Sequence, residues 1–361
     1  MTQQIKLPFY IKITFILIGV YTLVSILFFA QSIIVPLLFS TIFAILLSPL
    51  VNYLTRIKLN RVVSILIVLL SLIFLMVLGI FIFAKQLIGF SDAAPVVIEK
   101  VYKIITEIIK WISLQFDISI ENVYAMLEDT KQEIITKSKS IIGPALLNIK
   151  DVLIVGLVMP VYIFMIIYYQ PLLVEFIHKL YGAENKLVVS KILSSTKFII
   201  QRYLLALLLE AGIMATLNSI GLYILGIPYA IILGILGAIL NIIPYLGGLI
   251  AMALYVVIAL VTKDQSIYML YVLILYTIIQ LIDNNLIMPK LVGSKVKINA
   301  LVAIIVVVLG GTLWGVPGMF VSLPIIAIVK LVCDNIESLK PWGFLLGDTM
   351  PSINIFNKNK V

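Results

Sequence analysis

The chain is poor in charged residues. Only 12% of its 361 residues are Asp, Glu, Lys or Arg, about half of the 25% typical of a soluble domain. Hydrophobic residues make up 62%, the mean hydropathy is +1.19, and several runs of more than about 18 residues carry no charge. This composition excludes an ordinary soluble domain and predicts an all-α polytopic integral membrane protein.

Cysteine and histidine are nearly absent, with Cys333 and His178 the single residue of each type. One cysteine excludes an intramolecular disulfide and a four-thiolate zinc site, and one histidine excludes a two-histidine metal site. The motifs of serine hydrolases, zinc proteases and P-loop ATPases are also missing. We therefore expect no metal site, no cofactor and no enzyme activity. A membrane-embedded hydrolase that uses His178 has little support from the sequence.

The net charge of +9 does not indicate nucleic-acid binding, because the Lys and Arg residues lie beside the apolar runs. The expected partner is the lipid bilayer. Arg56, Lys58 and Arg61 in the short loop "RIKLNR" predict a cytoplasmic loop, and Lys6 and Lys12 agree with a cytoplasmic N-terminus. The first apolar run has no A-x-A cleavage site, which favours a retained span. Counting the spans also places the C-terminus in the cytoplasm.

Five regions follow along the chain. Residues 85–150 carry eight lysines and eight acids, with apolar residues at helical spacing over 97–112, which predicts a small helical extracytoplasmic domain. A cationic, amphipathic stretch near 186–202 either lies in the inner-leaflet interface or packs on the protein itself. The predicted regions are three spans in 1–84, the extracytoplasmic domain in 85–150, the fourth span and cytoplasmic amphipathic helix in 151–202, a glycine-rich transport core in 203–340 and a cytoplasmic tail in 341–361.

Two runs, 228–262 and 298–332, are each 35 residues long. A continuous helix of that length would measure about 52 Å, against a hydrocarbon core of about 30 Å. Each run is either one long kinked span, giving eight spans in all, or a re-entrant hairpin of two short helices. With hairpins, Lys290, Lys295 and Lys297 become cytoplasmic, as the positive-inside rule expects. We favour six full spans plus two re-entrant hairpins, with eight spans as the alternative.

Both runs are interrupted near their centres, by "NIIPYLGG" and by "GGTLWGVPG". Proline has no N–H to donate, and glycine permits non-helical backbone. Backbone groups freed at membrane depth must be buried or line a polar cavity, and secondary transporters bind substrates at such breaks. The alternative is that the glycines only permit close helix packing. The predicted substrate path contains Asn241, Pro244, Tyr245, Gly247, Gly248, Gly310, Gly311, Gly315 and Gly318.

Few polar groups occur within the apolar runs. An acid in a span costs a few kcal/mol unless it is paired or protonated, so Glu210 in "LLLEAGIM" and Asp283 in "QLIDNNLIMPK" are candidates for ion coupling, with Asn284 and Asn285 beside Asp283. Of the two acids we prefer Asp283, because it adjoins amides. The alternative for Glu210 is a structural hydrogen bond, with Thr216 or Asn218 as partners by type. The alternative for the 283–285 triplet is a helix cap near the interface.

The stretches "LGIPYAIILGILGAILNIIPYLGG" and "GGTLWGVPGMFVSLP" place glycines and prolines in a characteristic order in the C-terminal half. With them this half resembles the bacterial autoinducer-2 exporter family of permeases. The order of elements is similar over essentially the whole chain, and the specific residues lie within 226–332. Gly248 stands where the family often has proline, and Asn299–Ala300 stands where it often has His-Pro, so a coupling scheme based on that histidine does not transfer to this chain. The matching residues are Gly226, Pro228, Ala230, Asn241, Pro244, Tyr245, Gly247, Pro289, Gly293, Gly310, Gly311, Gly315, Gly318 and Pro324.

The resemblance implies a homo-oligomeric secondary transporter of the bacterial cytoplasmic membrane that exports a small polar solute or signalling metabolite, coupled to sodium or protons. The family includes members associated with autoinducer-2 export and others with sodium or proton antiport. A monovalent cation/proton antiporter is therefore the first alternative. A non-transporting membrane scaffold that uses residues 85–150 for docking is the second.

Overall fold

The computed structural model describes residues 8–116, 149–182, 185–243, 246–263, 265, 267–291 and 298–349. Pro244, Tyr245 and residues 117–148 of the predicted extracytoplasmic domain lie outside these residues. Over the described part the chain is helical, apart from one isolated bridge between Ile298 and Gly347. Among the described residues, seven helices are long and apolar enough to cross a membrane, which confirms the all-α polytopic membrane fold.

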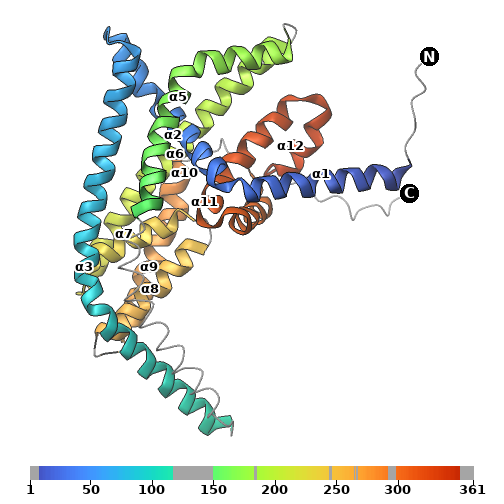
Figure 1. Cartoon of the computed structure of the whole chain (residues 1–361). Helices are drawn as coiled ribbons and strands as arrows, with labels where there is room; N and C mark the ends of the chain where they lie inside the picture. Colours follow the sequence, from blue (N-terminus) through green and yellow to red (C-terminus); the bar gives the residue numbers. More distant parts are fainter. Residues whose placement is uncertain are drawn as a thin grey trace. The chain divides into compact units, whose positions relative to one another are not determined.

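Figure 1 labels the helices in chain order. Their bounds are α1 Phe9–Phe29, α2 Gln31–Arg56, α3 Arg61–Phe116, α5 Ile149–Tyr181, α6 Lys186–Ile224, α7 Ala230–Asn241, α8 Leu246–Thr262, α9 Ile267–Ile282, a π-helical turn Asp283–Ile287, α10 Met288–Leu291, α11 Ala300–Asn335, a 3₁₀ turn Glu337–Leu339 and α12 Lys340–Leu346.

The chain forms two compact units, which we describe separately. The first unit comprises Met1–Ile45, Val158–Lys197 and Lys297–Val361, and the second comprises Leu46–Leu157 and Phe198–Val296. The first contains α1, α11, α12 and parts of α2, α5 and α6. The second contains α3 and α7 to α10, with the remaining parts of α2, α5 and α6.

Several helices continue past the spans predicted from hydropathy. α3 is a single helix of 56 residues, so the third span and the start of the predicted extracytoplasmic region are continuous. α6 has 39 residues and joins the predicted amphipathic helix to the fifth span. Hydropathy changes along these helices without ending them: α3 continues through Gly89 and Pro95, and α6 contains no proline.

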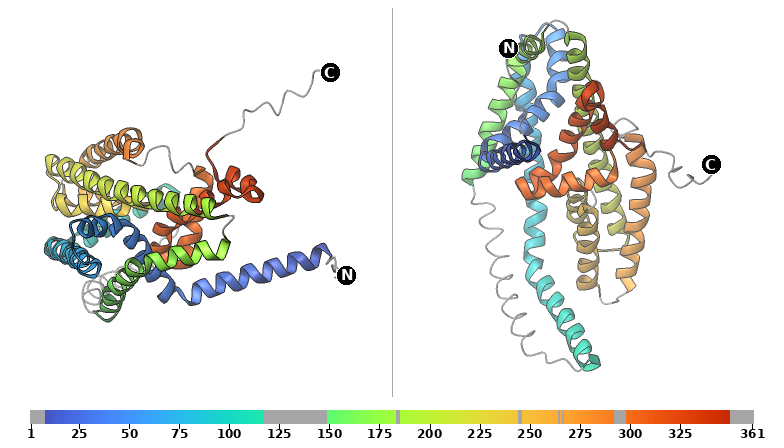
Figure 2. Two further views of the ribbon diagram at one scale, coloured as in Figure 1. Left: turned by 90° about the horizontal axis from the view of Figure 1, so that it is seen from above. Right: turned by 90° about the vertical axis from the view of Figure 1, so that its right-hand side faces the viewer.

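The first interrupted run forms a helical hairpin in the second unit. α7 and α8 are antiparallel neighbours, and α9 packs along α8 (Figure 1 and Figure 2). Near the tip, Gly247 packs against the Leu240 carbonyl, and further down Gly237 packs against the Tyr255 hydroxyl. At the open end, a Cβ on Gly226 would lie 3.1 Å from Lys263 Nζ. These close approaches need glycine, since a side chain at Gly237 or Gly247 would overlap the neighbouring helix.

The second interrupted run forms a hairpin in the first unit. α11 turns at Gly315, whose φ of 65° and ψ of −146° are non-helical and suit only glycine. The two arms run back along each other, because Gly310 packs against Gly318 and Ser322. Trp314, next to the turn, donates its indole N–H to the Leu27 carbonyl of α1 at 3.0 Å. Both predicted interruptions are therefore tips of helical hairpins. Whether each hairpin enters and leaves the membrane on one side stays a prediction.

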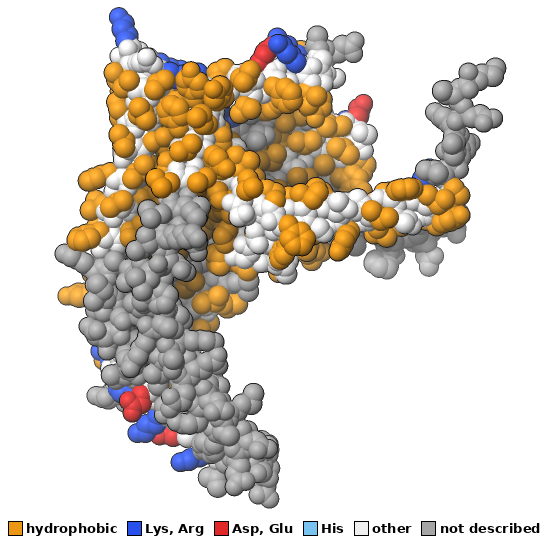
Figure 3. Space-filling view, in the orientation of Figure 1, with side chains coloured by type: hydrophobic (Ala, Val, Ile, Leu, Met, Phe, Trp, Pro, Cys, Tyr) orange, Lys and Arg blue, Asp and Glu red, His pale blue; other side chains and the backbone are white. Residues whose placement is uncertain are grey.

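Large hydrophobic side chains are exposed on many of the described helices. Figure 3 shows them along the length of α1, where no residue is buried. Phe15 on α1 is 66% exposed and Phe74 on α3 is 67% exposed. A soluble protein rarely exposes apolar surface on this scale, so these helix faces are lipid-contacting surfaces.

Candidate functional site

Three polar side chains meet in the second unit although they are far apart in the sequence. The Asn241 amide nitrogen, Nδ2, lies 3.4 Å from Glu210 Oε1 and 3.4 Å from Asp283 Oδ2. Both contacts are long for hydrogen bonds, whose usual N···O distance is about 2.9–3.0 Å. One amide group thus connects two carboxyl groups across three helical elements.

The three residues are placed by features of the local backbone. Glu210 lies on α6, and Asn241 is the last residue of α7, at the tip of the hairpin. Asp283 begins the π-helical turn after α9. A π-turn contains an extra residue and changes the direction of the side chains that follow, and such turns often occur at functional sites. Tyr276, Gln280 and Asp283 are spaced at i, i+4 and i+7, which places them on one face.

Both acids are buried, with relative exposures of 5% for Glu210 and 2% for Asp283. Neither has a Lys or Arg ion-pair partner among the described residues. Glu210 Oε2, Asp283 Oδ1 and Gln280 Oε1 are buried and have no hydrogen-bond donor in the described part of the protein. An isolated ionised carboxylate in such surroundings is costly, so the pair requires neutralisation by a proton or a bound cation.

The first turn of α8 completes the polar cluster. Tyr276 donates its hydroxyl hydrogen to the Gly248 carbonyl at 2.7 Å. A Cβ added to Gly248 would lie 2.8 Å from the Tyr276 hydroxyl, 3.3 Å from Asn241 Oδ1 and 3.7 Å from Gln280 Oε1. Gly248 therefore lies within the cluster, and its lack of a side chain leaves room for these groups. We name Glu210, Asn241, Gly248, Tyr276, Gln280 and Asp283 the polar cluster.

Tyr276 was not among the candidates predicted from the sequence. A tyrosine in an apolar helix is most often a packing residue, and Tyr276 also contacts Tyr255 edge-to-face, with ring centroids 5.9 Å apart. The available signal was its spacing, seven residues before Asp283 on the same helix face. Gln280, one turn before Asp283, carries the same signal.

Other candidates lie elsewhere. Asn284 and Asn285 are exposed, and Asn285 donates to the Leu281 carbonyl at 2.8 Å. The structural partners considered for Glu210 bond within their own helix instead, Asn218 to the Met214 carbonyl and Thr216 to the Gly212 carbonyl. The helix continues through the 283–285 triplet to Leu291, so the triplet does not end the segment as a cap.

The glycines of the second run have packing roles that the structure shows directly. A Cβ on Gly318 would overlap the Gly310 carbonyl, and one on Gly311 would lie 2.5 Å from Met319 Cε. Gly315 supplies the turn, with open space around the position of its absent side chain.

The polar cluster suits a proton or a small hard cation. Its groups are carboxyl, amide and phenol oxygens, which are the ligands that hard cations prefer. No group of three His, Cys, Asp or Glu side chains that could hold a metal ion occurs among the described residues. The chemistry available here is the exchange of protons or the coordination of a weakly bound monovalent cation.

Comparison with known proteins supplies independent information. A family model described as AI-2E family transporter matches residues 13–338. YueF of Bacillus subtilis, provisionally named a transport protein, is 29% identical over 349 residues, covering 91% of this chain and 89% of YueF. A Haemophilus influenzae protein with the same provisional name is 26% identical over 332 residues, covering 88% of this chain and 91% of its own length. A Borreliella burgdorferi relative is 30% identical over 157 residues, which are 43% of each chain.

Proposed function

This chain belongs to the AI-2E family of transporters, and from that premise we propose that it is an ion-coupled secondary transporter whose coupling cation binds at the polar cluster. Membership supports a permease of the membrane and a small solute as its cargo. The proposal adds a direction: the protein exports a small polar molecule or signalling metabolite across the bacterial cytoplasmic membrane. The family resemblance also supports a homo-oligomer.

One observation carries the proposal, namely that the Asn241 amide connects two buried acids that have no basic partner among the described residues. Two carboxyl groups that share one amide donor repel each other when both are ionised. The binding of one cation removes that repulsion and completes the coordination of the free oxygens. Intramembrane acids are expected to serve transport because their burial is costly otherwise.

The position of Asn241 suggests how the cation is coupled to movement. Asn241 ends α7, whereas Glu210 and Asp283 lie on α6 and after α9. When the acids change their charge, the contacts of the hairpin tip change with them. The tip is thereby stabilised in different positions in the loaded and empty states, which is the differential binding that coupling requires.

The same observation favours a second candidate, a monovalent cation/proton antiporter. In that case the cluster binds a cation and protons alternately, and no organic solute is carried. The two candidates share the same site and differ in cargo, so they are separated by a flux measurement. The scaffold alternative requires no buried cation site, and the cluster gives it no support.

The test uses purified full-length protein in sealed vesicles. A sodium or pH gradient is imposed, and movement of protons is followed with a trapped pH-sensitive dye and that of a labelled small polar metabolite by filtration. Asp283→Asn preserves shape and removes the charge. Loss of a hydrogen bond to a charged group is worth about 1.5–3 kcal/mol, so we expect ion affinity to fall about tenfold to a hundredfold.

Glu337→Gln is the matched control, because Glu337 is an acid whose side chain is 91% exposed. It should transport as the unchanged protein does. Solute flux that depends on the gradient identifies the exporter, and exchange of cations for protons without solute identifies the antiporter. Unchanged flux in both Asp283→Asn and Glu210→Gln would overturn the role of the cluster.

A further inference from the structure

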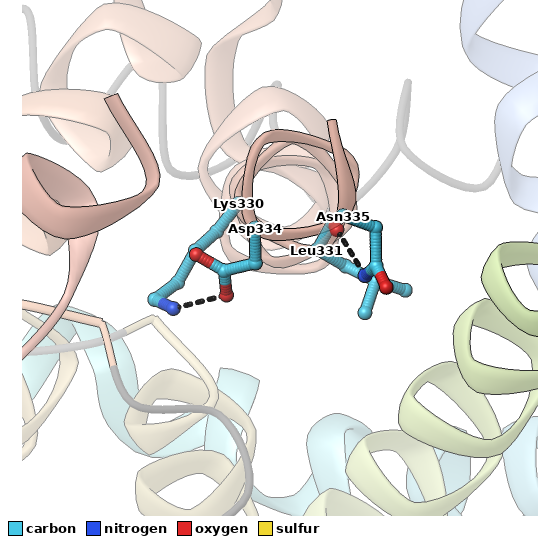
Figure 4. A network of polar contacts seen from close by, with 4 residues as sticks. All are labelled: Lys330, Leu331, Asp334 and Asn335. Carbon is cyan, nitrogen blue, oxygen red and sulfur yellow. Dashed lines mark hydrogen bonds and ion pairs between the residues drawn. The ribbon is translucent and has the colours of Figure 1, made fainter. Parts of the chain in front are cut away.

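The last turn of α11 marks the point where that helix leaves the apolar region. Lys330 Nζ pairs with Asp334 Oδ2 at 2.6 Å, and Asn335 donates its amide to the Leu331 carbonyl at 2.8 Å. Figure 4 shows these polar groups around the end of the helix. Charged and amide side chains at the end of a span lie at the level of the lipid headgroups, where water is available.

α12 begins only five residues after Asn335 and is therefore held at the same level. Its inner side packs on α11, because a Cβ on the buried Gly343 would overlap the Asp334 carboxylate. Beyond α12, Gly347 bridges to Ile298, and the Leu346 carbonyl accepts the Asn299 N–H at 3.0 Å. α12 and the residue after it thus contact both the beginning and the end of α11.

The outer side of α12 is apolar and unpartnered within the described protein. Trp342 is 61% exposed, Phe344 58% and Leu345 57%. Lys340, at the start of the helix, pairs with Glu337 of the preceding turn at 3.1 Å, and both are exposed. Aromatic side chains beside a lysine are typical of the boundary between hydrocarbon and headgroups, where Trp is enriched.

We propose that α12 is an interfacial anchor, whose Trp342, Phe344 and Leu345 insert into the bilayer at the boundary between hydrocarbon and headgroups. The partner is the lipid surface itself, since α12 begins five residues after the end of α11, a helix long and apolar enough to cross a membrane, and its outer side is apolar. Through Gly347 and Leu346 the anchor holds the open end of the second hairpin at the membrane surface. This role is independent of the solute and of the coupling ion.

The test uses spin labels to measure how deeply residues of α12 lie in the bilayer. Cys333 is the single cysteine, so Cys333→Ala gives a background into which Trp342→Cys, Leu345→Cys or Glu337→Cys is introduced. Each nitroxide-labelled protein is placed in vesicles of phosphatidylethanolamine and phosphatidylglycerol, and its accessibility to oxygen and to a water-soluble nickel chelate is compared. Labels at 342 and 345 should show a several-fold higher ratio of oxygen to nickel accessibility than the control at 337.

Equal nickel accessibility at 337, 342 and 345 would overturn the proposal, because it would place α12 in water. Strong spin–spin broadening at 342 and 345 that disappears when labelled protein is diluted with unlabelled protein would also overturn it, in favour of a second copy of the chain. Brominated lipids provide a measurement without cysteine substitution. They should quench more fluorescence in the unchanged protein than in Trp342→Phe, and equal quenching would contradict the anchor.

Discussion

At the scale of single residues, the distinctive feature of the polar cluster is that its two acids have no basic partner among the described residues. Glu210 is the one charged residue between Arg202 and Lys263, and Asp283 is 2% exposed. An unpaired charge in such a position costs a few kcal/mol on insertion scales. That cost is tolerated in transporters because a cation that binds and leaves can neutralise the acids in turn.

Gly248 provides the first prediction at this scale. A side chain there would meet Tyr276, Asn241 and Gln280, so Gly248→Leu should displace the Tyr276 hydroxyl from the Gly248 carbonyl and fill the cluster. Overpacking costs about 1–3 kcal/mol, and we expect flux in vesicles to fall about tenfold or more while the protein still inserts. Fluorescence-detected size exclusion reports the amount of folded protein.

Gly212→Leu is the control for that substitution. Gly212 lies two residues from Glu210 on the same helix, and nothing approaches the position of its absent Cβ within 4 Å. Its flux should be unchanged. If Gly248→Leu also transported normally, the cluster would be only a packing feature, as the scaffold alternative requires.

At the scale of elements, each hairpin depends on glycine to bring two helices together. In α11 the arms touch at Gly310 and Gly318, and Ser322 donates its hydroxyl to the Gly318 carbonyl at 2.6 Å. In α7 and α8 the contact points are Gly237 and Gly247. Packing in a bilayer gains little from the hydrophobic effect, so close backbone approach is the principal source of helix association.

Gly318→Val tests the second hairpin. The added side chain would overlap the Gly310 carbonyl and separate the arms, which should destabilise the fold by about 1–3 kcal/mol. Thermal unfolding in detergent should show a lower midpoint than for the unchanged protein. Gly19→Val in α1 is the matched control, because nothing lies near that position. An equal midpoint for both variants would mean that the arms do not depend on this contact.

At the scale of the whole molecule, two hydrogen bonds of the second unit bear on the topology. In the second unit Gln201 of α6 donates to Ser48 of α2 at 3.3 Å, near the end of α2 that carries Arg56. Lys100, far along α3 from Arg61, donates to the Val261 carbonyl at 2.7 Å. The Arg61–Ile82 part of α3 is long and apolar enough to cross a membrane, so we predict that the end of α8 lies on the opposite side from the "RIKLNR" loop.

Cysteine labelling tests this topology in the Cys333→Ala background. Gln265→Cys should react with a membrane-impermeant thiol reagent in intact cells, whereas Lys290→Cys should react only after the membrane is opened. Ile57→Cys, in the "RIKLNR" loop, is the cytoplasmic reference. The reverse pattern at 265 and 290 would contradict the hairpin topology and favour the alternative of eight spans, in which residues 228–262 cross the membrane once.

The sequence alone identified Glu210, Asn241 and Asp283 as separate candidates, but it could not join them. Asn241 is 31 residues from Glu210 and 42 from Asp283, and only the packing of α6, α7 and α9 brings them together. The sequence also could not show which side chains of the 283–285 triplet face the protein interior. Asp283 faces inward while Asn284 and Asn285 face outward, because consecutive helical residues differ by about 100° in direction.

Composition and local pattern determined the rest: long uncharged runs predict membrane spans, and the clusters of Pro and Gly in 241–248 and 310–318 predict breaks. These are properties of short segments, since each backbone group must be satisfied within or close to its own helix. Tertiary structure decided which segments meet. Contacts with other helices, rather than local preference, place Asn241 between two acids and place Gly248 among polar groups. They also bring α12 against the two ends of the second hairpin.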